Sequence, residues 1–275
     1  MLSTCLEHVR NAGPLIHCVT NYVTVNDCAN ALLAAGGSPI MADDPAEVEE
    51  ITGICAALAV NIGTLNQQTI PAMLLAAARS AELGHPLILD PVGAGASALR
   101  TNTALRLLET AKFTAVRGNI SEIKALAGAG GGAKGVDADV ADRVTEENLD
   151  QAVAFAREFA RRRGLIVAVT GAIDIVADAK TAYLIRNGHP MMSRITGTGC
   201  MLTAVMAAYL AANPQDRLEA AAAAVAAMGL CGQLAYAKMM ALEGGNSTLR
   251  DHLIDGLCNL TGPALEAGAL VEKRA

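Results

Sequence analysis

The chain has 275 residues, of which 52% are hydrophobic, and its formal net charge is −6 at pH 7. This length suits one large α/β domain or two small ones, and because no repeat or charged linker divides the chain we expect residues 1–275 to form a single domain. A negative charge without a basic stripe argues against nucleic-acid binding, and the longest apolar run, residues 220–232, is shorter than the ~20 residues that cross a membrane.

Apolar runs alternate with helical patterns along most of the chain. The sequence predicts strands at residues 15–20, 39–42, 57–62, 86–89, 113–116 and 165–169. It predicts helices at residues 26–35, from about 45, 68–83, 98–110, 120–127 and 146–163. Strands that are apolar throughout and alternate with helices predict a mostly parallel sheet covered on both faces, a three-layer α/β/α sandwich.

Three further segments complete this pattern. The Gly- and Ala-rich stretch from Gly128 to Gly135 lacks the G-x-x-x-x-G-K-[ST] arrangement of a P-loop, and we interpret it as a linker. Residues 173–177 and 181–185 predict an antiparallel hairpin at the edge of the sheet. The chain after Cys200 is predicted to be helical, and one buried stripe is formed by Leu249, Leu253, Leu257 and Leu260.

The residues Gly197-Thr198-Gly199-Cys200 precede a run rich in Ala, Met and Leu that predicts a helix. Glycines let the backbone turn tightly and bring its N–H groups close to a ligand. The start of the helix adds unpaired N–H donors and the positive end of the helix dipole, which attract an anion such as a phosphate. The alternative is an ordinary junction between a loop and a helix, where Gly and Thr are also common.

Polar residues follow three of the predicted strands. Asp90 ends one strand, Arg117 ends the next and leads to Glu122, and Thr170 ends a third. In open α/β sheets the ligand crevice lies beyond the carboxyl ends of the strands, so these side chains are expected on one rim with the Gly197–Cys200 turn. An acid, a base, a hydroxyl and a group of backbone N–H donors predict a phosphoryl-transfer site, with Asp90 and Glu122 beside Mg²⁺ and Arg117 facing phosphates.

Both acids also have purely structural interpretations. Asp90 precedes Pro91, and an Asp-Pro pair is a common turn. Asn119 and Glu122 have the spacing of a capping box, which would account for them without a ligand. A cap at that position would still point the helix end at the crevice, so the structural and functional interpretations of Glu122 are compatible.

Cys200 is one of seven cysteines, which are scattered and include no Cys-x-x-Cys pair. This spacing argues against a disulfide framework or a zinc site and favours a reducing cytoplasm. On the first turn of a helix we expect the pKa of the Cys200 thiol to be lowered, so that the thiolate accepts a proton from a substrate. The alternative is that Cys200 is a small buried apolar residue.

The chain resembles the hydroxyethylthiazole kinases of the ribokinase-like superfamily over nearly its whole length. The resemblance rests on the segments His17-Cys18-Val19-Thr20-Asn21, Ser38-Pro39-Ile40-Met41-Ala42, Val60-Asn61-Ile62-Gly63-Thr64, Leu89-Asp90-Pro91-Val92-Gly93, Val116-Arg117-Gly118-Asn119, Val169-Thr170-Gly171 and Gly197-Thr198-Gly199-Cys200. Ribokinase-like enzymes usually have Asp as the base where this chain has Cys200, and the cysteine is characteristic of the thiazole branch.

The resemblance implies ATP- and Mg²⁺-dependent phosphorylation of 4-methyl-5-(2-hydroxyethyl)thiazole, a salvage step toward thiamine. It implies that Met41 contacts the thiazole, with Asn21 and Val23 nearby and Gly197 beside the substrate hydroxyl. Arg117 and Thr170 correspond to nucleotide contacts, and Asp90 and Glu122 to the metal site. The family forms homotrimers with sites between neighbouring subunits, which would account for the apolar composition.

Three rival functions remain at this point. One is a kinase of the same superfamily that acts on the pyrimidine half of thiamine, against which the cysteine at position 200 argues. A second is a non-catalytic ligand-binding protein that has kept the fold. A third, dinucleotide binding, is weak because Gly197 and Gly199 are followed by Leu202 where a third glycine would be required.

Overall fold

The computed structural model describes residues 2–128 and 143–275. Within these ranges one mixed sheet has the strand order β2-β1-β3-β4-β5-β6-β7-β8-β9. Its strands are β1 (Leu15–Val19), β2 (Ser38–Ile40), β3 (Ala57–Asn61), β4 (Leu87–Asp90), β5 (Ala115–Asn119), β6 (Ile166–Thr170), β7 (Asp174–Ala177), β8 (Ala182–Ile185) and β9 (Val271–Arg274). The linker predicted from Gly128 to Gly135 lies outside the described residues, except for Gly128.

Helices connect the strands and continue to the C-terminal region. They are α1 (Leu2–Ala12), α2 (Val25–Ala35), α3 (Val48–Ile54), α4 (Thr69–Glu82), α5 (Ala98–Thr110), α6 (Ile120–Leu126), α7 (Leu149–Arg163), the 3-10 helix η2 (Pro190–Arg194), α8 (Thr198–Ala212), α9 (Arg217–Ala241), α10 (Asn246–Asn259) and α11 (Gly262–Gly268). The helix predicted at 26–35 ends as expected, because Gly36 adopts the left-handed conformation that closes a helix.

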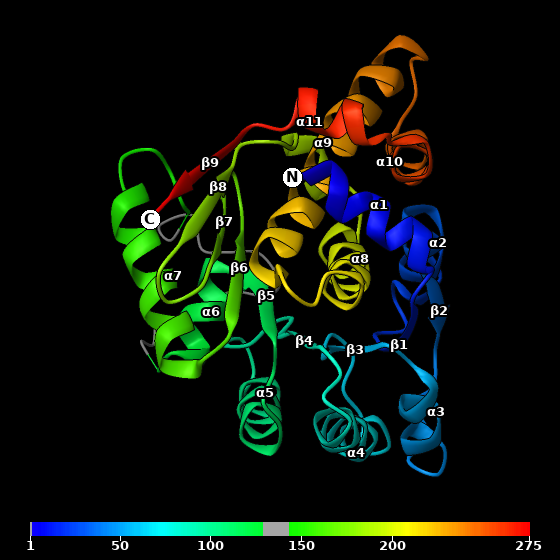
Figure 1. Cartoon of the computed structure of the whole chain (residues 1–275), viewed down its shortest axis with the longest axis vertical. Coiled ribbons are helices and arrows are strands. Elements are labelled where there is room, and N and C mark those ends of the chain that lie inside the picture. Colours follow the sequence, from blue (N-terminus) through cyan, green and yellow to red (C-terminus); the bar gives the residue numbers. More distant parts are fainter. Residues whose placement is uncertain (1, 129–142) are drawn as a thin grey trace.

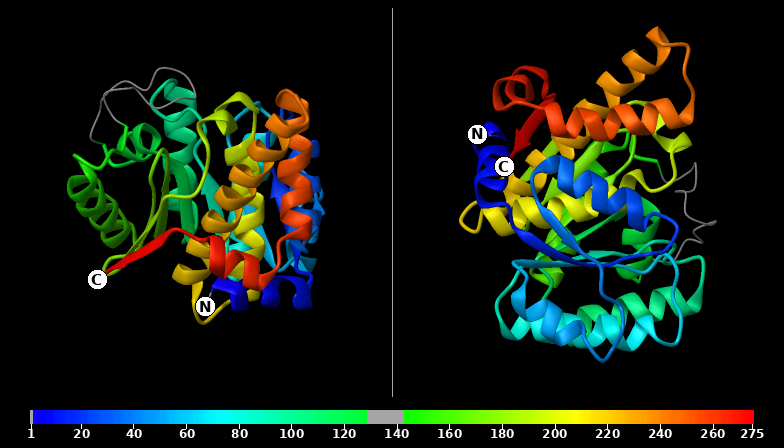
Figure 2. Two further views of the ribbon diagram at one scale, coloured as in Figure 1. Left: turned by 90° about the horizontal axis from the view of Figure 1, so that it is seen from above. Right: turned by 90° about the vertical axis from the view of Figure 1, so that its right-hand side faces the viewer.

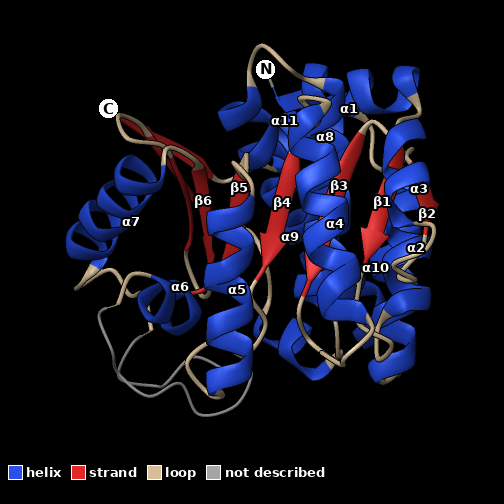
Figure 3. Cartoon of the chain, turned by 90° about the horizontal axis from the view of Figure 1, so that it is seen from below, coloured by secondary structure: helices blue, strands red, loops and turns tan. Residues whose placement is uncertain are grey.

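Two cores lie on opposite faces of the sheet, which confirms the predicted α/β/α layers. Ile88 packs with the core of α1, α2, α8, α9 and α10, whereas its neighbour Leu89 packs with the core of α4 to α7. This division follows from the strand itself, in which successive side chains point to opposite faces. Figure 1 shows α4 and α5 on one side of β3 and β4 and α8 on the other, and Figure 3 shows α4 and α5 in front of the sheet.

The predicted hairpin is present, but its position at the edge of the sheet is wrong. β7 and β8 are antiparallel, and β9 then pairs with β8 from Ala182–Arg274 to Ile185–Val271. The prediction that everything after Cys200 is helical therefore fails at β9. Its sequence, Val-Glu-Lys-Arg, has one apolar residue, and a short charged strand of this kind is typical of a sheet edge.

The apolar stripe predicted near the C-terminus is confirmed, because Leu249, Leu253, Leu257 and Leu260 are all buried. Helix α9 extends the apolar run at 220–232 into a longer helix. In the described part of the chain it is the one helix long and apolar enough to cross a membrane, but most of its apolar stretch is buried inside the fold. Figure 2 shows the first part of α9 packed among other helices and its C-terminal end extending beyond them. Because its apolar stretch is mostly buried, we interpret α9 as a core helix.

Candidate active site

Parallel pairing brings the predicted strand-end residues to one rim. Asn61 at the end of β3 lies opposite Asp90 at the end of β4. Asn119 at the end of β5 lies opposite Thr170 at the end of β6. Because all four strands are parallel, their carboxyl ends meet at the same edge of the sheet, which is where open α/β folds bind ligands.

Arg117 contacts two of the other predicted site residues, Thr170 and Asp90. Its Nη2 donates a hydrogen bond to Thr170 Oγ1 at 2.7 Å, and its Nη1 lies 3.5 Å from Asp90 Oδ1. Only 13% of the Arg117 side chain is exposed, and the Asp90 side chain is fully buried. The guanidinium is therefore held by side chains from both neighbouring strands, β4 and β6.

Asp90 is a buried carboxylate supported by several donors. Its Oδ2 accepts hydrogen bonds from Asn61 Nδ2 at 2.8 Å and from Thr203 Oγ1 at 2.9 Å. Burial raises the pKa of Asp90, while Arg117 and the two side-chain donors act in the opposite direction. A buried carboxylate of this kind gains from any cation that enters the crevice.

Glu122 forms the predicted capping box at the start of α6. The Asn119 side chain accepts from the Glu122 N–H at 2.9 Å, and the Glu122 Oε2 accepts from the Asn119 N–H at 2.8 Å. Its other oxygen, Oε1, accepts from the Gly93 N–H at 2.8 Å. Burial and the charge of Asp90 nevertheless raise the pKa of Glu122 to about 7. The cap thus places a second buried acid within electrostatic reach of Asp90.

Both glycines of the Gly197–Cys200 turn make close contacts that a side chain would block. Gly197 has a φ of +85°, and a Cβ there would overlap the side chain of Thr24. A Cβ on Gly199 would overlap the guanidinium of Arg117. The first helical hydrogen bond runs from the Met201 N–H to the Gly197 carbonyl at 2.8 Å. The N–H groups of Thr198, Gly199 and Cys200 precede that bond and lie at the positive end of α8, beside Arg117.

The prediction of a lowered pKa for Cys200 is wrong. The thiol does lie on the first turn of α8, but burial and the nearby charge of Asp90 raise its pKa, and these effects outweigh the hydrogen bonds from Thr24 and Asn21 and the charge of Arg117. Asn21 Nδ2 lies 3.3 Å from the Cys200 sulfur. The helix end lowers the pKa of a thiol only where the thiolate stays well solvated, and Cys200 is only partly exposed.

Met41 and Val23 are apolar residues outside this hydrogen-bonded group. Val23 lies on the turn before α2 and is 57% exposed, whereas Met41 follows β2 and is partly buried against the core. The segment after Met41 is anchored by the buried His17, whose Nε2 donates to the Ala42 carbonyl at 2.8 Å. Burial lowers the pKa of His17, so the ring is neutral and its Nδ1 accepts from Thr52 at 2.9 Å.

Sequence reasoning missed two residues that contact Asp90. Asn61 is the last residue of an apolar strand, and Thr203 is one turn into α8. A signal was present for Thr203, because it follows Gly199 by four positions, which places both on one face of the helix. Asn61 offered a weaker signal, as a single amide at the end of β3 in line with the predicted strand-end site.

The candidate site contains few metal-binding side chains. Within residues 2–128 and 143–275, no group of three or more His, Cys, Asp or Glu side chains is placed to hold a metal ion. Asp90 and Glu122 supply two buried carboxylates whose charges oppose each other. Mg²⁺ is usually bound by one or two carboxylates together with water and substrate phosphates, so this pair fits a nucleotide-bound Mg²⁺ and not an all-protein metal cage.

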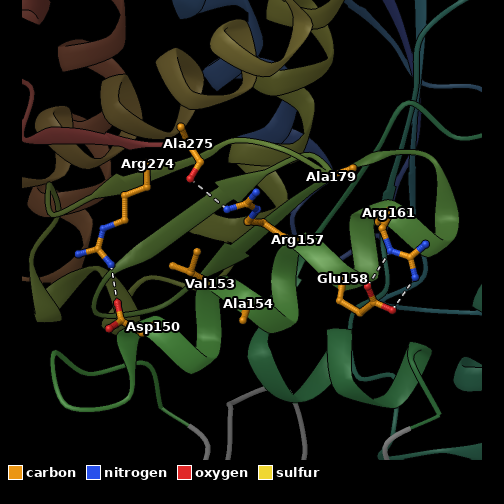
Figure 4. Close-up of a pocket in the computed structure, with 9 residues that line it drawn as sticks. All are labelled: Asp150, Val153, Ala154, Arg157, Glu158, Arg161, Ala179, Arg274 and Ala275. Atoms are coloured by element: carbon orange, nitrogen blue, oxygen red, sulfur yellow. Dashed lines mark hydrogen bonds and ion pairs between the residues drawn. The ribbon is translucent and has the colours of Figure 1, made fainter.

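A separate cavity of about 380 Å³ lies beside α7 and the C-terminal residues (Figure 4). Its arginines are already bonded within the chain: Arg274 donates to Asp150 at 2.7 Å, and Arg161 donates to Glu158 at 2.8 and 2.9 Å. None of its lining residues belongs to the group at the strand ends. The cavity is therefore distinct from the candidate site.

Comparison with known proteins identifies the family of this chain. The model of the hydroxyethylthiazole kinase family matches residues 6–262. The chain belongs to the hydroxyethylthiazole kinase family. It is 57% identical to the hydroxyethylthiazole kinase of Clostridium acetobutylicum over 272 residues, covering 99% of both chains. It is 50% identical to that of Desulfovibrio desulfuricans, covering 98% of this chain and 96% of the relative.

Solved structures agree with this family. The hydroxyethylthiazole kinase protein of Pyrococcus horikoshii OT3 matches with a TM-score of 0.88 and 34% identity, covering 100% of this chain and 99% of that one. A ribokinase-like protein from Enterococcus faecalis matches with a TM-score of 0.61 at 14% identity, covering 94% of this chain and 90% of that one, and shows the shared fold. The activity is that of a hydroxyethylthiazole kinase, a salvage step toward thiamine, and it implies ATP as the phosphoryl donor.

Proposed function

We propose that the side chains at the strand ends transfer the γ-phosphoryl group of ATP to the primary hydroxyl of 4-methyl-5-(2-hydroxyethyl)thiazole. One observation carries this placement: the Arg117 guanidinium lies against Gly199 while it contacts Asp90 and Thr170. The Arg117 guanidinium and the N-terminal end of α8 then border the same space, and the buried carboxylates of Asp90 and Glu122 flank that space. Phosphoryl transfer depends mostly on positioning and charge stabilisation, which such a group supplies.

Each residue receives a role consistent with its position. Arg117 and Thr170 bind the nucleotide phosphates, and the backbone N–H groups from Gly197 to Cys200 stabilise the group in transfer. Gly197 lies beside the substrate hydroxyl. The thiazole is held by Met41, with Asn21 and Val23 nearby. Cys200 lies beside the hydroxyl and, in its thiolate form, accepts the proton of that hydroxyl.

Mg²⁺ is the cation that this site would hold. Asp90 and Glu122 would be its protein ligands, since burial raises the pKa of both carboxyls and a cation would relieve their mutual repulsion. When bound, Mg²⁺ neutralises charge on the phosphates. The buried amide and hydroxyl donors around Asp90 keep its carboxylate in one orientation, and the capping box does the same for Glu122.

Cys200→Ala should lower kcat by ~10²-fold, the lower end of what a general base contributes, and leave the affinity for ATP nearly unchanged. The raised pKa of the thiol means that the thiolate is scarce at neutral pH and strongly basic once formed. The kcat of the unaltered enzyme should therefore rise toward alkaline pH. The measurement is a coupled ADP-release assay from pH 6.5 to 9.5. Cys200→Ser serves as the matched control, because its hydroxyl still accepts from Asn21. An unchanged kcat in Cys200→Ala would remove the thiol from the mechanism.

The same assay separates the rival substrates. We expect steady ADP release with the thiazole alcohol and at least tenfold slower release with the pyrimidine alcohol of thiamine under identical conditions. Equal or faster turnover of the pyrimidine would favour the rival kinase. Calorimetric binding of the thiazole and ATP without ADP release on prolonged incubation would favour a non-catalytic binding protein.

We further infer a cytoplasmic homotrimer with sites between subunits. Tyr22 and Val23, next to Asn21, are 77% and 57% exposed, and large apolar side chains beside a site are often covered by a neighbouring subunit. Light scattering should give about three times the chain mass of 28.2 kDa. Val23→Asp should yield smaller species with lower activity, because it places a charge in that contact. A fully active monomer would contradict this arrangement.

A further inference from the structure

The side chain of Asn61 occupies a central position that the assigned roles leave unexplained. It is 2% exposed and lies at the end of β3, between Asn21 of the neighbouring strand end and Asp90. Its Oδ1 accepts the Gly63 N–H at 2.9 Å. Because a backbone N–H can only donate, this bond determines which end of the amide is oxygen. The NH₂ group of Asn61 must therefore face Asp90, to which it donates at 2.8 Å.

The orientation of Asn21 is determined in the same way. Its Oδ1 accepts from the Thr24 N–H and from the Thr24 hydroxyl, each at 3.1 Å. Its NH₂ group is therefore directed away from Thr24, and it donates to Asn61 Oδ1 at 3.0 Å and lies 3.3 Å from the Cys200 sulfur. Two backbone N–H groups thus orient a continuous series of side chains from Cys200 to Asp90.

The two oxygens of Asp90, at the end of this series, differ in their hydrogen-bond partners. Oδ2 accepts two hydrogen bonds, from Asn61 and from Thr203. Oδ1 lies 3.5 Å from the Arg117 Nη1. Oδ1 accepts one hydrogen bond, from Arg117, and so keeps more acceptor capacity than Oδ2. The bond from Asn61 is one of two that hold the carboxylate in this orientation.

We propose that Asn61 is a positioning residue for phosphoryl transfer. Its NH₂ group holds Oδ2 of Asp90, so that Oδ1 faces the transferring group. Its oxygen holds Asn21 against Cys200. Asn61 thereby sets the distance between the substrate end and the phosphate end of the site without touching either ligand. The proposal rests on the proposed location of the active site.

Two substitutions at this position separate the donor from the rest of the side chain. Asn61→Asp keeps the shape and still accepts from Gly63 and Asn21, but it places a carboxylate oxygen against Asp90 Oδ2. Asn61→Ala removes every bond. If the donor to Asp90 is what matters, both variants should lose ~10²-fold in kcat, the cost of a misplacement of about 1 Å. Their calorimetric affinities for a non-hydrolysable ATP analogue and for the thiazole alcohol should stay within threefold of the original.

Asn213→Ala is the matched control for the loss of a buried, bonded amide. Asn213 follows α8 at the end opposite Cys200, is 5% exposed, and bonds to Tyr209 and Cys5. The Asn213→Ala substitution should lower the melting temperature and leave kcat unchanged. A wild-type kcat in Asn61→Asp, alongside a low kcat in Asp90→Asn, would overturn the proposal for Asn61 alone. Wild-type rates in both would instead reject the proposed active site.

Discussion

Gly199→Ala should lower kcat by ~10²–10³-fold, the cost of losing one group that stabilises the charge in transfer. A Cβ at this position overlaps the guanidinium of Arg117, so the arginine has to move. It then loses its 2.7 Å bond to Thr170 and its contact with Asp90. Steady-state kinetics should also show a higher KM for ATP, because Arg117 is the proposed phosphate ligand.

The same substitution should not destabilise the protein through its backbone. Gly199 lies in the first turn of α8, and alanine favours a helix over glycine by about 1 kcal/mol. We therefore expect activity to fall while stability rises or stays the same. Gly53→Ala is the matched control, since Gly53 lies in α3 with nothing near its added Cβ. Normal kcat and KM in Gly199→Ala would show that Arg117 has no fixed role.

Asp90→Asn should abolish most turnover, with an expected loss of at least ~10³-fold, equivalent to about 4 kcal/mol of transition-state stabilisation. The neutral amide cannot balance Arg117, cannot act as a carboxylate ligand for Mg²⁺, and has only one oxygen for the donors of Asn61 and Thr203. The measurement is single-turnover ADP formation at saturating Mg²⁺ and ATP, which reports chemistry without product release.

Unlike turnover, the thermal stability of Asp90→Asn should not fall. Burial raises the pKa of Asp90, so the ionised carboxylate is disfavoured in the folded chain and its replacement should leave the melting temperature equal or higher. The sign follows from linkage. When the pKa of an acid is higher in the folded chain than in the unfolded chain, the free energy of unfolding falls as the pH rises above the pKa of the unfolded chain. Asp150→Asn, at a side chain 93% exposed, is the control for removing one negative charge and should keep full activity. Near-normal turnover in Asp90→Asn would exclude this carboxylate from the reaction.

Most of the strand-end residues could be found from the sequence because of a topological rule. Asp90 and Thr170 each end an apolar segment, and Arg117 lies in the next strand of the same parallel set, so alternation alone places all three on one edge. The Gly197–Cys200 turn is found in the same way, as a glycine-containing entry to an apolar helix. These inferences need only the direction of the chain and the period of its side chains.

Other properties depend on contacts that no local pattern contains. The pKa of Cys200 was expected to fall because of the helix end, yet the packing of its surroundings and the charge of Asp90 raise it. In the sequence, Asn61 is a single polar residue at the end of an apolar strand. Only the structure shows that it forms hydrogen bonds with both Asn21 and Asp90. The edge strand β9 was missed because its charged residues resemble a solvated tail.

Periodicity and motif order are properties of the chain, so the layers, the mostly parallel sheet, the family and the rim that carries the polar residues could all be predicted from the sequence. The pKa and the hydrogen-bond partners of each group on that rim follow from tertiary contacts. Desolvation, charge and hydrogen-bond direction depend on which distant segments pack together, as when Asp90 of β4 meets Thr203 of α8 and Arg117 meets Gly199. Those contacts join residues far apart in the chain, so their energies are set by the fold.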